Sequence, residues 1–98
     1  MKIEQTVFLT QQMSLPKIIE LIVENEHFQC EITVKKERKV CNGKSLLGLV
    51  SFLLFLKVGD EYQIIADGRD AKIAVNHWCK RTRNIKERNK KVERFYFN

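Results

Sequence analysis

Two histidines and three cysteines are the residues of this sequence whose side chains could bind a metal ion or act as nucleophiles. His27 is expected in the loop after a helix at 14–25, and His77 on a helix that begins near residue 70. Histidines at such places usually have surface or packing roles. Cys30, Cys41 and Cys79 are an odd number at wide spacing, and they match neither a zinc site nor a CxxC redox pair. We therefore expect reduced thiols, no metal site and no cofactor.

Two serines lie where helices are expected to begin. Ser14 precedes Pro16, and Ser45 follows the turn signal Asn42-Gly43. A serine at such a position caps the first turn of a helix through its hydroxyl. The unpaired amides and positive dipole end of that turn also favour a phosphate group. Ser14 and Ser45 are therefore expected to cap their helices.

The apolar pattern predicts seven elements in the order β-α-β-β-α-β-α. Strands are expected at 5–10, 31–34, 39–41 and 62–66, and helices at 14–25, at 45–55 and from 70 onward. Helices mixed with strands, including one tight β-β pair, are typical of a two-layer α+β domain with helices on one face of an antiparallel sheet. In the second helix, Leu49, Phe52 and Leu53 are placed to enter the core.

The net charge of +6 is distributed unevenly along the 98 residues. Residues 1–78 are neutral, whereas residues 79–98 hold eight Lys/Arg against two Glu. We expect one domain at 1–79 and a basic extension at 80–98. That extension, with aromatic residues at its end, is either a solvated continuation of the helix or a segment that binds nucleic acid.

No segment predicts a signal peptide or a membrane span. The longest apolar stretch, residues 46–56, is interrupted by Gly48 and Ser51 and is too short to cross a bilayer. With 44% hydrophobic and 31% charged residues, the composition is that of a globular domain. We expect a cytoplasmic protein that has no membrane partner.

The segment 42–51 reads N-G-K-S-L-L-G-L-V-S and is similar to the N-x-K-S-[IL]-x-G-[VL]-[MV]-S segment of HPr proteins from low-GC Gram-positive bacteria. Shorter matches occur at 31–34, at 59–61 and in the A-D-G-R-D turn at 66–70. The chain thus resembles the HPr phosphocarrier family of the sugar phosphotransferase system over residues 31–75. The resemblance implies an open-faced β-sandwich of HPr type and a role that is not enzymatic.

The segment in which the family carries its active histidine departs from the pattern. HPr proteins have H-x-R-P there, whereas this chain has Met13-Ser14-Leu15-Pro16, without an imidazole or a guanidinium. A thioether cannot take up phosphate reversibly, and a serine ester is too stable to pass it on. We therefore expect no phosphocarrier activity, and the alternative is a carrier that uses an unexpected residue.

Ser45 keeps the position of the family's regulatory serine. In Gram-positive HPr proteins an ATP-dependent serine kinase modifies this residue, and the product is a corepressor for a LacI-type transcription regulator. The catabolite-repression paralogue Crh also lacks the histidine and keeps the serine, and this chain resembles that pattern. The resemblance implies a regulatory protein of carbon catabolite control, with the serine kinase and the LacI-type regulator as partners. A plain helix cap at Ser45 is the alternative reading.

Three apolar residues of the second helix correspond to the surface through which HPr proteins bind their partners. They are Leu46, Leu47 and Val50. An exposed apolar patch on a small protein usually marks an interface. Self-association into a homo-oligomer would use such a patch equally well.

Overall fold

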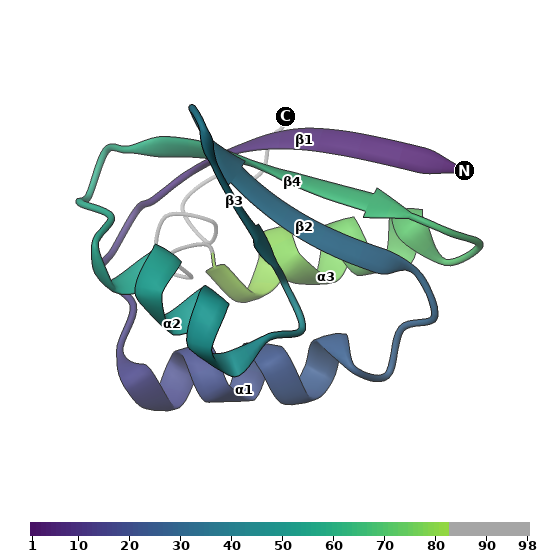
Figure 1. Cartoon of the computed structure of the whole chain (residues 1–98), viewed down its shortest axis with the longest axis horizontal. Coiled ribbons are helices and arrows are strands. Elements are labelled where there is room, and N and C mark those ends of the chain that lie inside the picture. The colour runs from purple at the N-terminus through teal and green to yellow at the C-terminus, as the bar shows by residue number, and fades with distance from the viewer. Residues whose placement is uncertain (83–98) are drawn as a thin grey trace, which may run out of the picture.

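A computed structural model describes residues 1–82 as a four-stranded antiparallel sheet covered by three helices (Figure 1). The strands are β1 (Lys2–Phe8), β2 (Glu31–Lys36), β3 (Lys39–Asn42) and β4 (Glu61–Asp67), and the helices are α1 (Leu15–Asn25), α2 (Leu46–Leu54) and α3 (Ala71–Thr82). The predicted order β-α-β-β-α-β-α and the α+β class are confirmed. None of the helices in this part of the chain is long and apolar enough to cross a membrane.

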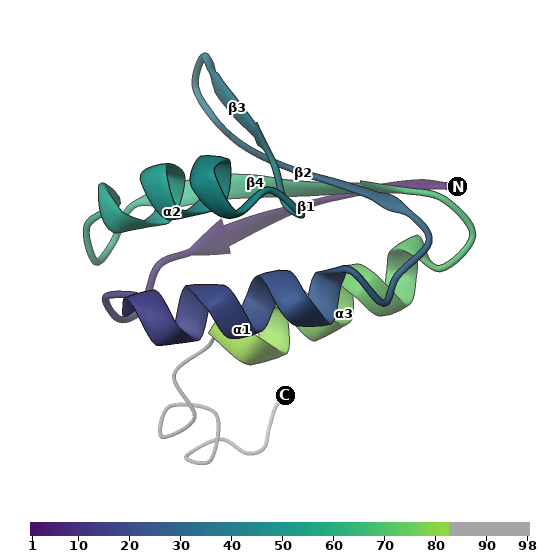
Figure 2. The ribbon, with the colours of Figure 1, turned by 60° about the horizontal axis from the view of Figure 1, so that its bottom comes forward.

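The sheet has the strand order β1-β4-β2-β3, so β1 and β3 form its edges. All three helices lie on one face, and the β2–β3 hairpin projects away from the rest of the sheet (Figure 2). The hairpin turns at Glu37, whose φ of 55° lies in the left-handed region. The other face of the sheet carries mostly polar side chains, as expected for a strand pattern in which alternate residues are exposed.

The core lies between the sheet and the helices. At its centre the buried Trp78 indole N–H donates a hydrogen bond to the hydroxyl of the buried Tyr62, at 3.0 Å. The Tyr62 ring meets Phe52 of α2 edge to face, with centroids 5.9 Å apart. Burial raises the pKa of Tyr62 to about 12, so its hydroxyl keeps its proton and its place in the core. Leu49, Phe52 and Leu53 are buried, as the sequence predicts.

The ends of the elements differ from the sequence prediction by a few residues. β1 begins at Lys2 because its polar first half pairs with β4 along the whole strand, from Lys2 opposite Asp67 to Phe8 opposite Glu61. α2 ends at Leu54, with Phe55 as its C-cap. α3 continues to Thr82, so the first three residues of the predicted extension, 80–82, belong to this helix.

Candidate functional site

The first candidate segment, Met13 to Pro16, begins α1. The Ser14 hydroxyl accepts a hydrogen bond from the backbone N–H of Lys17 at 3.3 Å, so Ser14 is the N-cap, as predicted, and Pro16 lies in the first turn. Met13 is only 3% exposed and packs in the core, whereas Leu15 is exposed. At these two positions the structure thus places a thioether in the core and an isobutyl group in solvent.

Ser45 begins α2 in a similar way. Its backbone is extended, with φ −97° and ψ 121°, and its hydroxyl accepts a hydrogen bond from the Gly48 N–H at 3.3 Å. The residue is half-buried. Because the N–H groups of the first turn of a helix have no partners within the helix, a negative charge at Ser45 would be stabilised there.

The turn that presents Ser45 is fixed by contacts with two other elements, α1 and β2. The side-chain amide of the buried Asn25, at the end of α1, donates to the Gly43 carbonyl at 2.8 Å. The Gly43 N–H donates to the Ile32 carbonyl of β2 at 2.7 Å. A Cβ atom at Gly43 would lie 2.5 Å from the Ile32 Cγ2 atom, so only glycine allows this approach. The backbone before Ser45 is therefore rigidly placed.

Lys44, next to Ser45, directs its ammonium group elsewhere. Its Nζ atom donates to the backbone carbonyl of Phe28, in the loop between α1 and β2, at 2.6 Å. Its backbone N–H donates to the Asn42 side-chain oxygen at 2.8 Å. The lysine side chain therefore fastens the turn to the neighbouring loop.

The two candidate segments lie at opposite ends of an antiparallel helix pair. Asn25, at the end of α1, contacts the turn before α2, whereas Gln12, before α1, donates to the Leu56 carbonyl after α2 at 3.1 Å. Figure 2 shows α1 and α2 running in opposite directions. The structure does not bring Met13, Ser14 and Leu15 together with Ser45, so the two segments must be tested as separate sites.

The predicted partner surface follows Ser45 directly. Leu46 and Leu47 are exposed, Leu47 to 79%, while Val50 is half-buried and packs against the edge of the core. The two leucines lie side by side in the first turn of α2 and form an exposed apolar patch. Ser45 and this apolar patch are adjacent, so a charge on one would act on the binding of the other.

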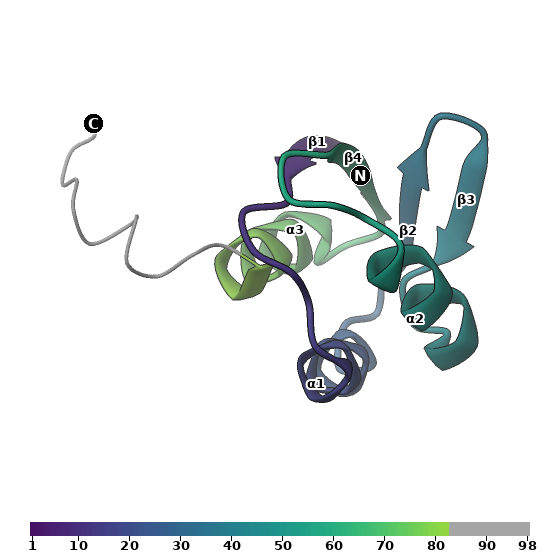
Figure 3. The same cartoon turned by 90° about the vertical axis from the view of Figure 1, so that its left-hand side faces the viewer.

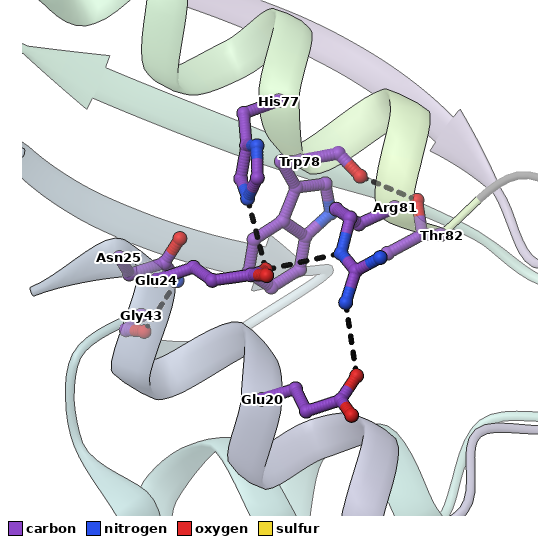
Figure 4. A network of polar contacts seen from close by, with 8 residues as sticks. All are labelled: Glu20, Glu24, Asn25, Gly43, His77, Trp78, Arg81 and Thr82. Atoms are coloured by element: carbon purple, nitrogen blue, oxygen red, sulfur yellow. Dashed lines mark hydrogen bonds and ion pairs between the residues drawn. The ribbon is translucent and has the colours of Figure 1, made fainter. Parts of the chain in front are cut away.

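A polar network between α1 and α3 was not foreseen from the sequence (Figure 4). Glu24 accepts hydrogen bonds from His77 at 2.9 Å and from the Arg81 Nε atom at 3.0 Å. The Arg81 Nη2 atom donates a hydrogen bond to the Glu20 carboxylate at 2.9 Å. Burial tends to raise the pKa of Glu24, but the hydrogen bonds and charges of His77 and Arg81 hold it below its ordinary value.

The A-D-G-R-D turn also has a structural explanation. The Asp70 carboxylate accepts hydrogen bonds from the backbone N–H groups of Gln29 and Cys30, at 2.8 and 2.9 Å. The bond from Gln29 contributes most to lowering the pKa of Asp70, and Cys30 adds to it against the opposing effect of desolvation. Burial, together with Asp70, raises the pKa of the Cys30 thiol to about 11, so this cysteine stays a neutral thiol.

The histidines lie away from the start of α1. His77 is engaged in the network with Glu24, and His27 is exposed in the loop after α1. The predicted nucleic-acid segment lies outside the described residues beyond Thr82. Its first part, through Arg81 and the buried Thr82, instead holds α3 against α1 and the core.

Comparison with protein families decides the identity of the fold. The family described as "PTS HPr component phosphorylation site" matches residues 17–81. The chain belongs to the HPr family. The match begins at Lys17, just after the Met13–Pro16 segment. No curated protein sequence matches.

Solved HPr structures share the fold of this chain. The phosphocarrier protein HPr of Bacillus anthracis has a TM-score of 0.74 and 23% identity, and the alignment covers 84% of this chain and 98% of that one. The histidine-containing phosphocarrier protein of Mycoplasma has a TM-score of 0.70 and 26% identity, with 81% and 90% covered. Crh of Bacillus subtilis, described as an intertwined dimer with a swapped domain, has a TM-score of 0.64 and 24% identity, with 76% and 83% covered.

Proposed function

We propose that this HPr-family chain is a cytoplasmic regulatory protein of the sugar phosphotransferase system or of carbon catabolite control, and that it carries no phosphate on histidine. Phosphorylation of Ser45 would control which partner binds the patch of Leu46, Leu47 and Val50. The protein is not an enzyme in this proposal, because it presents a surface and a modifiable hydroxyl rather than a catalytic group.

One contrast supports the proposal: the segment Met13–Pro16 offers no imidazole, whereas Ser45 lies at the N-terminus of α2. Met13, which takes the histidine position when the segment is anchored on Pro16, is buried, whereas a phosphoryl acceptor must be exposed and nucleophilic. A one-residue slip would put Ser14 there instead, whose phosphate ester is too stable to pass phosphate on. Ser45 is half-buried at a helix N-terminus, where a phosphate is electrostatically favoured. This pattern is unsuited to relaying phosphate and suited to receiving a regulatory phosphate.

Phosphate on Ser45 would change the surface more than the fold. It would place about two negative charges beside Leu46 and Leu47 at neutral pH. Partners that bind bare apolar surface would be weakened, and partners that offer arginine would bind more tightly. We propose an HPr-type serine kinase as the modifying enzyme and a LacI-type transcription regulator as the partner of the phosphorylated form.

Two parallel phosphorylation reactions test the proposal. In one, the full chain is incubated with the general energy-coupling kinase of the sugar system and phosphoenolpyruvate. In the other, it is incubated with an HPr serine kinase and ATP. Intact mass and peptide mapping are expected to show no phosphate in the first reaction and one phosphate, on Ser45, in the second. The Ser45→Ala variant should remain unmodified by the serine kinase.

An ordinary HPr in the same tubes serves as the control for both enzymes. If the serine kinase modifies that HPr and not this chain, the regulatory role of Ser45 is excluded. If an acid-labile phosphate appears on His27 or His77 at the rate of the control, the chain is a carrier with an atypical residue. In that outcome the alternative function replaces the proposed one.

A further inference from the structure

The β2–β3 hairpin concentrates positive charge at its turn. Residues 35–39 read K-K-E-R-K, so four cations and one carboxylate occupy five consecutive positions. Lys36 and Lys39 lie directly opposite each other in the strand register, and like charges placed in this way destabilise an antiparallel pair. The Glu37 carboxylate, 3.9 Å from the Lys36 ammonium group, forms only an exposed ion pair of little strength. A hairpin that keeps this local conflict is a candidate for a functional element.

Two cations of the turn have no anionic partner in the described part of the chain. Lys35 and Arg38 are exposed, and neither forms an ion pair within residues 1–82. Glu61, at the start of β4, lines a shallow hollow together with Lys35 but does not pair with it. Both cations are therefore free to contact an external anion.

The topology brings further positive charge to the same end of the molecule. Because β2 and β4 are antiparallel, with Lys35 opposite Gln63, the hairpin turn lies where β4 begins. Trp78, near the end of α3, donates to Tyr62, near the start of β4, so α3 ends there too. Figure 3 views this end of the molecule. Residues 83–98, with six Lys/Arg and two Glu, thus continue from the end that carries the hairpin.

We propose that the β2–β3 hairpin binds double-stranded DNA, with Lys35, Lys36, Arg38 and Lys39 contacting the phosphates that border the major groove. This groove is about 12 Å wide and admits a two-stranded β-ribbon. The hairpin projects from the sheet as such a ribbon (Figure 2). Contacts to phosphates carry no sequence information, so the binding is independent of base sequence.

The basic residues of 83–98 would contact the same duplex. These sixteen residues reach up to about 50 Å when extended, which is enough to follow the DNA beyond the hairpin. Neither group of cations suffices alone, because affinity grows with each phosphate that is neutralised. The hairpin turn and Ser45 lie beyond opposite ends of β3, so this binding does not depend on the proposed regulatory site.

The chemistry of the turn favours DNA over other anionic partners. Residues 35–39 include no apolar side chain, whereas a segment that lies on a membrane needs apolar residues to insert among the lipids. The core of a protein–protein interface is depleted of charged residues and enriched in aromatic ones, and the turn has the reverse composition. A phosphate backbone offers a regular row of negative charge and requires no apolar contact.

Fluorescence anisotropy with a short labelled DNA duplex tests this proposal. The full chain is expected to bind at low salt, and its affinity should fall steeply as salt is added, because neutralised phosphates release counterions. Lys35→Glu combined with Arg38→Glu should weaken binding at least about tenfold and make the salt dependence less steep. Glu37→Gln, which removes the carboxylate of the turn, should tighten binding about twofold.

Arg69→Glu combined with Lys72→Glu is the matched control. These residues are exposed and lie between the end of β4 and the first turn of α3, at the opposite end of the sheet from the hairpin turn. The control makes the same change in net charge and should leave the affinity nearly unchanged. Ser45→Ala should also bind normally. Thermal unfolding of each variant verifies that the fold is retained.

Four results would overturn the proposal. The first is a full chain that does not bind the duplex at low salt. The second is a control reversal that weakens binding as much as the hairpin reversal, because net charge alone would then be responsible. The third is a single strand of the same length that binds as tightly as the duplex. The fourth is displacement of the DNA by polyglutamate or by phosphatidylserine vesicles at an equal concentration of negative charge.

Discussion

Asn25 is a polar side chain enclosed in a core of otherwise apolar residues. Its amide nitrogen holds the Gly43 carbonyl, while its side-chain oxygen is buried without a hydrogen-bond partner. Burying a polar oxygen without a partner costs free energy, which the hydrogen bond to the Gly43 carbonyl must offset. The bond fixes the turn before Ser45 to the end of α1, so we infer that this residue positions the turn.

Replacing Asn25 by alanine should therefore destabilise the protein. The Gly43 carbonyl would lose its donor in a buried place, at a cost of about 1–3 kcal/mol. Chemical denaturation monitored by tryptophan fluorescence measures this loss, since Trp78 is in the core. Asn76→Ala, which alters an exposed asparagine of α3, should cost less than about 0.5 kcal/mol. Equal losses for the two variants would exclude a positioning role.

The capping role of Ser45 is measurable without any kinase. Ser45→Ala removes the acceptor of the Gly48 N–H and should cost about 1 kcal/mol. Ser45→Asp keeps a capping oxygen and adds negative charge at the helix N-terminus, so its stability should remain close to that of the original chain. Ser51→Ala, at an exposed position within α2, should be neutral or slightly stabilising. Denaturation midpoints that rank Ser45→Ala with Ser51→Ala would show that the cap is not used.

At the scale of the elements, the sequence predicted those features that depend on residues close together in the chain. Ser14 with Pro16, and Ser45 after Asn42-Gly43, located both helix starts correctly because caps are short-range features. The Glu24–His77–Arg81 network could not be predicted, because Glu24 lies more than fifty residues from His77 and Arg81 and meets them only when α1 and α3 pack together. The start of β1 was missed for the same reason: its polar residues become a strand by pairing with β4.

The network between α1 and α3 should make stability depend on acid. Since the pKa of Glu24 is lower in the folded chain than its ordinary value of 4.5, the carboxylate stabilises the fold above that pH. This stabilisation is lost as the pH falls through the lower, folded-state pKa. Glu24→Gln should therefore lose stability at neutral pH and show a flatter decline below pH 4.5 than the original chain.

Unfolding free energies measured across the acid range verify this expectation. Glu26→Gln changes an exposed carboxylate just beyond the same helix and should preserve the original pH profile. Glu20, Glu24, His77 and Arg81 are the ionisable groups that face one another between the two helices. A Glu24→Gln profile parallel to that of the original chain would show that this network contributes nothing to acid stability.

At the scale of the whole molecule, charge separates two regions. Residues 1–78 are neutral overall, and the net +6 belongs to residues 79–98. The structure refines the boundary that composition suggested, because Arg81 bonds to Glu20 and Glu24 and Thr82 is buried with its hydroxyl donating to the Trp78 carbonyl at 2.9 Å. Composition records where charges occur along the chain, but not which of them take part in packing.

Two truncations should therefore behave differently. A chain ending at Thr82 keeps every α3 contact described above and should unfold at nearly the original temperature. A chain ending at Cys79 loses Arg81 and Thr82, and thus the ion pairs to α1 and the bond to the Trp78 carbonyl. Its melting temperature should therefore fall by several degrees, on the order of 4–8 °C per kcal/mol lost.

Both truncated chains should lose any salt-sensitive binding to RNA or DNA that the full chain has, because each phosphate contact releases counterions and requires a cation. Calorimetry and anisotropy with a nucleic acid at low salt measure the two effects separately. Equal melting temperatures for the two truncations would place the domain boundary at residue 79, and a full chain that ignores nucleic acid at low salt would exclude the polyanion role of the basic segment.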